Sequence, residues 1–146
     1  MKKLKSLFII FGPLIGGILV GIISQSKNYQ YFIKPILSPP GFIFPIVWSI
    51  LYLLMGISLY IIKKEKQSIK ITFLLQLLTN YLWPILFFNF KLYTISAVWL
   101  ILLIALTIKM IIEFYNIKKI AGLLQFPYFL WLLFALYLNI GVAILN

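Results

Sequence analysis

Two amide side chains inside an apolar run are the most suggestive polar residues in the sequence. Gln76 and Asn80 lie four residues apart and Trp83 follows three residues later, so all three share one face of a helix. Amides in a hydrocarbon environment need a hydrogen-bond partner on another helix or in water. This face therefore either joins helices through hydrogen bonds or lines a binding site, and the spacing leaves both interpretations open.

A second face of this kind lies near the end of the chain, in the segment PYFLWLLFALYLN at residues 127–139. At about 3.6 residues per turn, the face combines aromatic rings with a small residue and then a polar group. An amide facing lipid would be costly, so the face belongs against a neighbouring helix or a cavity. One wall of an internal site is one interpretation, and a packed interior without a ligand is the other, which this stretch alone favours. The residues of the face are Tyr128, Trp131, Ala135, Leu138 and Asn139.

A third stripe, formed by Trp48, Tyr52 and Met55, has the same helical spacing. In a membrane helix, such a stripe more often packs against a neighbour than contacts a ligand. The first apolar run contains two glycine pairs with small-xxx-small spacing, Gly12/Gly16 and Gly17/Gly21. This spacing lets helix backbones approach closely, within the bundle or between subunits.

The residues that are absent exclude several kinds of chemistry. The chain has no Cys and no His, so it has no thiolate nucleophile, no disulfide and none of the usual zinc and haem-iron ligands. Its only carboxylates, Glu65 and Glu113, lie far apart in the sequence and form no evident acid/base pair. We therefore expect no required cofactor, no metal site and no catalytic residues for hydrolytic or metal-dependent catalysis.

The composition is that of a membrane protein. Of the 146 residues, 64% are hydrophobic and only 10% are charged, whereas a soluble domain has about 25% charged residues. A spanning helix needs roughly 20 apolar residues, and the chain contains five such runs. We predict an all-α integral membrane protein, a five-transmembrane-helix bundle forming a single domain over residues 1–146. The expected helices cover about 6–24, 41–62, 71–90, 92–112 and 120–143.

The longest polar connection, residues 25–40, contains Pro35, Pro39 and Pro40, which prevent a continuous helix. It either folds over the mouth of a pocket or is an ordinary interfacial loop. We predict the pocket-covering loop. Pro84 should kink the third helix.

The lysines predict the orientation in the membrane. The net charge of +11 comes from thirteen lysines that lie mainly at the ends of apolar runs, which indicates membrane anchoring and not nucleic-acid binding. Nine lysines lie in the N-terminal segment and in the connections at residues 63–70 and 113–119. The other connections contain only three. By the positive-inside rule, the N-terminus is expected in the cytoplasm of a bacterial-type plasma membrane, with loop 25–40 outside.

Three segments carry a resemblance to a known family. Read together, KPILSPPGFIFPIVWSILYLLMGIS, NYLWPILFF and PYFLWLLFALYLN resemble the tryptophan-rich sensory protein family, which is also the translocator protein (peripheral benzodiazepine receptor) family. The resemblance covers essentially the whole chain. It implies a five-helix bundle, often a homodimer, with a pocket that opens toward the first loop and binds porphyrins. By motif, the implied pocket positions are Trp48, Asn80, Trp83, Trp131 and Ala135.

Two departures from the family pattern limit what is implied. The family's KPxWxPP loop has a tryptophan where this chain has Leu37, and no basic residue follows Tyr137, where the sterol motif requires one. On the resemblance as a whole, we expect a receptor for porphyrins and similar flat apolar ligands. Light-dependent porphyrin degradation and transport of such ligands are the alternatives. The expected partners are this ligand, membrane lipid and a second copy of the chain. The expected ligand-binding residues are Trp48, Tyr52, Gln76, Asn80, Trp83, Trp131, Ala135, Leu138 and Asn139.

Overall fold

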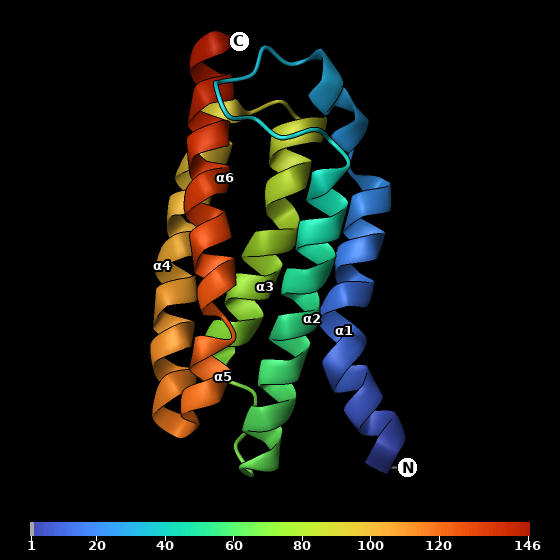
Figure 1. Cartoon of the computed structure of the whole chain (residues 1–146), viewed down its shortest axis with the longest axis vertical. Helices are drawn as coiled ribbons and strands as arrows, with labels where there is room; N and C mark the ends of the chain where they lie inside the picture. The colour runs from blue at the N-terminus through green and yellow to red at the C-terminus, as the bar shows by residue number, and fades with distance from the viewer. Residues whose placement is uncertain (1) are drawn as a thin grey trace.

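The computed structural model describes residues 2–146 as a bundle of upright helices (Figure 1), with no strand among those residues. Five helical stretches are long and apolar enough to cross a membrane, so the prediction of an all-α, five-span membrane protein is confirmed. The elements are α1 (Lys2–Ile23), the 3₁₀ helix η1 (Ser26–Tyr31), α2 (Ile43–Lys64), α3 (Ile71–Pro84), the π-helical η2 (Ile85–Asn89), α4 (Tyr93–Ile117), α5 (Lys119–Leu123) and α6 (Phe126–Leu145).

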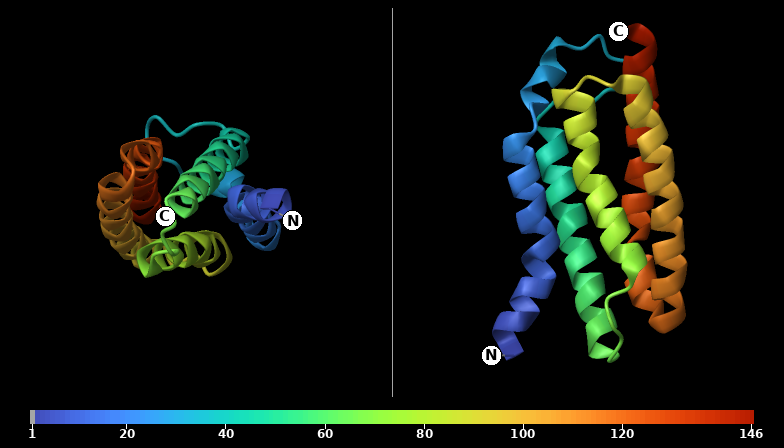
Figure 2. Two further views of the ribbon diagram at one scale, coloured as in Figure 1. Left: turned by 90° about the horizontal axis from the view of Figure 1, so that it is seen from below. Right: turned by 180° about the vertical axis from the view of Figure 1, so that it is seen from behind.

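The bundle is built from neighbouring pairs of helices. The most extensive packing joins α1 to α2 and α4 to α6, while α3 packs on α4. Seen along the bundle in Figure 2, α1 lies at one side and α4 at the other. The short α5 contacts α2, and from that end the ribbons of α2 and α6 diverge toward the end that carries the C-terminus (Figure 1).

Pro84 changes the geometry of the third span. Because proline has no backbone N–H, it interrupts the α-helical hydrogen-bond ladder, and here the five residues that follow it adopt π-helical geometry. The π turn ends at Asn89, whose side chain donates to the Ile23 carbonyl at the end of α1 (3.3 Å) and accepts from the Gln25 N–H (2.6 Å). The third span is thereby joined to the start of η1.

The last two spans differ from their expected bounds. The fourth was expected to end at residue 112, but α4 continues to Ile117. The added residues include Glu113, whose carboxylate accepts a hydrogen bond from Thr72 Oγ1 on α3 (3.0 Å). The fifth was expected as one helix and is divided between α5 and α6. At this break the buried Gln125 amide donates to Ser58 Oγ (2.7 Å) and to the Leu54 carbonyl (3.1 Å).

Candidate ligand pocket

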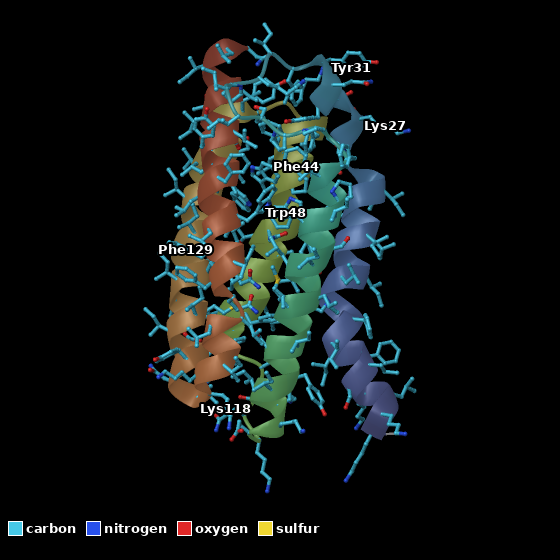
Figure 3. All side chains as sticks on the ribbon, in the orientation of Figure 1. Lys27, Tyr31, Phe44, Trp48, Lys118 and Phe129 are labelled. Carbon is cyan, nitrogen blue, oxygen red and sulfur yellow. The ribbon has the colours of Figure 1, made fainter. Side chains whose placement is uncertain are left out.

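A cavity of about 410 Å³ lies in the half of the bundle where α2 and α6 diverge. This volume is within the range of roughly 300–1,000 Å³ that is usual for small-molecule sites. Its walls come from α1, α2, α3 and α6, with η1 and the loop after it at one end. Figure 3 shows Phe44 and Trp48 on α2 in the space between that helix and α6.

The structure brings eight of the nine predicted site residues together around this cavity. The exception is Gln76, which is fully buried one turn deeper in α3 and does not line the cavity. Sequence spacing placed it correctly on the same face as Asn80, but the cavity ends above it. The eight lining residues are Trp48, Tyr52, Asn80, Trp83, Trp131, Ala135, Leu138 and Asn139.

A chain of hydrogen bonds forms the floor of the cavity. The Tyr52 hydroxyl donates to Asn80 Oδ1 (2.5 Å), and Asn80 Nδ2 donates to the Tyr128 hydroxyl (2.7 Å). Tyr128 in turn donates to Gln76 Oε1 (2.9 Å). Three helices, α2, α3 and α6, thus share one polar network in the apolar interior, which satisfies the amides that the sequence placed there.

A second amide joins three helices near the other end of the cavity. Asn139 is buried on α6; its Oδ1 accepts from Trp83 Nε1 on α3 (2.9 Å), and its Nδ2 donates to the Tyr93 carbonyl at the start of α4 (2.8 Å). The Trp83 ring also stacks on Phe87, with ring centroids 5.3 Å apart. These contacts fix the orientation of the Trp83 indole ring beside the cavity.

The aromatic walls include a buried indole N–H without a hydrogen-bond partner among the described residues. Trp48 stacks on Tyr52 (centroids 5.5 Å apart), and Trp131 meets Phe44 edge-on (5.9 Å). Trp131 Nε1 is buried and has no hydrogen-bond partner within residues 2–146. Because a buried, unpaired N–H is costly, a ligand acceptor that reaches it would be favoured.

The segment after η1 folds back on η1 beside one end of the cavity. The Tyr29 hydroxyl donates to the Pro39 carbonyl (2.8 Å), and partial burial raises the pKa of this hydroxyl above its ordinary value, so it stays protonated at neutral pH. Lys34 Nζ donates to the carbonyls of Tyr29 (2.9 Å) and Phe32 (3.2 Å) and lies over the Tyr29 ring. Lys34 therefore stabilises the position of this segment against η1.

Several lining residues were not predicted as site residues. Gly17 and Gly21 of α1 line the cavity, and a side chain at Gly17 would collide with the Tyr52 ring. Their small-xxx-small spacing was visible in the sequence, but it indicated close helix packing and not a cavity wall. Tyr29 and Phe44 also line the cavity. Phe44 lies four residues before Trp48 on α2, so helical spacing could have identified it, whereas only the three-dimensional position of η1 reveals Tyr29.

The chemistry of the lining is apolar with a few neutral donors and acceptors. No group of three or more His, Cys, Asp or Glu side chains comes together in the part of the chain that the structure describes. The arrangement can bind a flat, largely apolar molecule by stacking and by a few hydrogen bonds.

Comparison with known proteins assigns the family. The profile of the TspO/MBR family matches residues 9–145. A protein of Archaeoglobus fulgidus named Tryptophan-rich protein TspO is 39% identical over 117 residues, which cover 77% of this chain and 76% of that protein. The Translocator protein of Bos taurus is 30% identical over 137 residues, covering 87% of this chain and 81% of the relative. The resemblance inferred from the three segments is therefore confirmed, and this chain belongs to the TspO/MBR family.

Proposed function

We propose that this integral membrane protein is a receptor that binds porphyrins and similar flat apolar ligands in the cavity between α2, α3 and α6. The observation that carries the proposal is a 410 Å³ cavity whose walls combine three tryptophans with two buried amides. Large aromatic plates stack on a macrocycle, and the few polar groups orient it.

The donor set favours a porphyrin without a metal. The chain contains no His and no Cys, so the cavity lacks the usual axial ligands of haem iron. The donors it offers are neutral: the unpaired Trp131 indole N–H and the second N–H of the Asn80 amide. These groups suit the carbonyl and carboxyl oxygens or the ring nitrogens of a metal-free ligand.

The test is a porphyrin titration monitored by quenching of tryptophan fluorescence. Replacing Trp48 or Trp131 with Leu keeps a hydrophobic side chain and removes the aromatic plate. Aromatic contacts contribute about 0.5–1.5 kcal/mol beyond area burial, so each substitution should raise the Kd about twofold to tenfold.

Trp99 provides the matched control. It lies outside the cavity lining and donates its indole N–H to the Thr79 carbonyl (2.8 Å), joining α4 to α3. Trp99→Leu should lower stability without changing porphyrin affinity. If it weakens binding as much as Trp48→Leu and Trp131→Leu do, the ligand does not occupy this cavity.

A second candidate function is light-dependent degradation of the bound porphyrin. It is supported by oxidisable side chains in the cavity wall, namely Trp48, Tyr52 and Trp131. It requires only a bound sensitiser, oxygen and light. Illumination of the complex distinguishes the two functions: porphyrin loss that exceeds the rate in free solution and depends on Trp48 and Trp131 supports degradation, and equal rates exclude it.

Transport, orientation and assembly complete the proposal. Relatives carry the name Translocator protein, and porphyrin flux in proteoliposomes would separate a carrier from a receptor.

The lysine distribution supports a cytoplasmic N-terminus in a plasma membrane of the bacterial type. We propose that the protein forms a homodimer surrounded by lipid, which cross-linking in native membranes would test.

A further inference from the structure

The segment between η1 and α2, residues 32–42, exposes apolar side chains at one end of the bundle. We call this segment the strap. Ile36 and Leu37 at its tip are 83% and 78% exposed, and Ile33 and Phe42 are also largely exposed. Figure 1 shows the strap running from η1 to α6 and back to the start of α2. A patch of this kind needs a surface that covers it.

The depth of the strap follows from its contacts with α6. Asn139 is bonded to the Tyr93 carbonyl at the start of α4. From Tyr93 to Glu113, at 1.5 Å per residue, α4 rises about 30 Å, which is the thickness of a bilayer's hydrocarbon core. A core that is bounded by Glu113 on one side therefore has its other edge at the level of Tyr93 and Asn139. The Tyr137 hydroxyl donates to the Ile36 carbonyl, so the tip of the strap lies at the level of this edge.

The patch is continuous with the apolar surface of α6. The side chain of Asn146 makes two hydrogen bonds to the backbone of Ile33 (2.8 and 3.2 Å), which places the strap beside the end of α6. Ile144 and Leu145 are exposed there as well. The surface of α6 that faces lipid thus extends onto the strap without an intervening charged residue in the chain from Ile120 to Asn146.

The strap backbone is adapted to a region of low polarity. Three prolines remove N–H groups that would need acceptors. Side chains satisfy carbonyls along the segment: Ser38 Oγ donates to Pro35 (2.7 Å), in addition to the bonds from Tyr29, Lys34, Tyr137 and Asn146 already described. An ordinary water-exposed loop leaves such carbonyls to solvent, whereas an irregular segment at a membrane must satisfy them internally.

The tip of the strap has an unusual backbone conformation. Leu37 has a φ of 72°, in the left-handed region that a branched side chain rarely adopts. This conformation presents the leucine side chain outward, away from the bundle.

From these observations, we propose that the strap is an interfacial membrane anchor. The outward side chains of Ile33, Ile36 and Leu37 lie at the boundary between lipid headgroups and acyl chains, so the strap rests on the bilayer. The occupant of the patch is phospholipid.

The test is the depth of spin labels in phosphatidylcholine nanodiscs. The chain has no cysteine, so Ile36→Cys and Leu37→Cys can be labelled without other changes. The accessibility of each label to oxygen, which is concentrated in acyl chains, is compared with its accessibility to a water-soluble nickel chelate. Gln67→Cys in the exposed turn after α2 is the aqueous reference, and Leu102→Cys in the middle of α4, also exposed in the structure, is the hydrocarbon reference.

The proposal requires intermediate values at the strap. Labels at residues 36 and 37 should show less contact with the nickel chelate than Gln67→Cys and less contact with oxygen than Leu102→Cys. Contact with the chelate equal to that at Gln67→Cys would place the strap in water and overturn the proposal. A label that neither reagent reaches would show that protein covers the patch, which also overturns it. Because the nanodiscs contain no porphyrin, the result is independent of the proposed ligand.

Discussion

The hydrogen-bond chain beneath the cavity makes a quantitative prediction about Asn80. Replacing Asn80 with Leu keeps the branched shape of the side chain but removes its bonds to the hydroxyls of Tyr52 (2.5 Å) and Tyr128 (2.7 Å). Hydrogen bonds between membrane helices contribute about 0.6 kcal/mol on average and at most about 1.7. The loss of two bonds should therefore lower the free energy of unfolding by about 1–3 kcal/mol.

A double-mutant cycle isolates the bond between Asn80 and Tyr52. Tyr52→Phe removes only the hydroxyl, and in the native background it should cost about 0.6–1.7 kcal/mol. In the Asn80→Leu background the same hydroxyl has lost its acceptor, so its removal should cost nothing or restore some stability. The measurement is reversible unfolding of the four variants in mixed micelles without ligand.

The refuting result is additivity. If the two substitutions add within about 0.3–0.5 kcal/mol, the residues are energetically independent, and the network does not hold α2 to α3. Thr79→Val is the matched control, because Thr79 is also buried on α3 and its hydroxyl donates to the Leu75 carbonyl of its own helix (2.7 Å). A cost for Thr79→Val as large as that of Asn80→Leu would show that the assay reports burial and not the bonds between helices.

Two further predictions concern helix packing and orientation. A Cβ at Gly56 would collide with the backbone carbonyl of Ile10, whereas a Cβ at Gly12 meets nothing within 4 Å; Gly56→Ala should therefore cost about 1–3 kcal/mol of stability, and Gly12→Ala should be neutral or add up to about 1 kcal/mol, as measured by thermal unfolding. The lysine distribution predicts that an impermeant thiol reagent added to intact cells reaches Gln30→Cys and not Lys66→Cys, and the reverse labelling would contradict a cytoplasmic N-terminus.

Helical spacing accounts for most of what the sequence predicted about the cavity. Residues three or four positions apart share a face whatever the neighbours are, so the stripes that contain Trp48, Asn80 and Trp131 were visible without a structure. Spacing gives the face but not the depth at which a cavity ends, which explains why Gln76 was included among the site residues although it lies below the cavity.

The features that were missed depend on contacts between distant segments. The wall formed by Gly17 exists because α1 lies against the Tyr52 ring, and no local pattern specifies that approach. The role of Gln125 was also missed, since a single amide near the start of a span gives no periodic signal. Its partners on α2 are 67 and 71 residues away in the sequence.

The π-helical turn after Pro84 has a consequence for chain length in this span. A π turn holds one residue more than an α turn, so deleting one residue from Ile85–Asn89 would allow the α-helix to continue. Because the π turn absorbs its extra residue locally, the residues beyond it keep about the orientation that a continuous α-helix one residue shorter would give them. Asn89 therefore faces the Ile23 carbonyl and the Gln25 N–H, which attach η1 to the third span. The third span thus holds an additional residue without losing its register with η1.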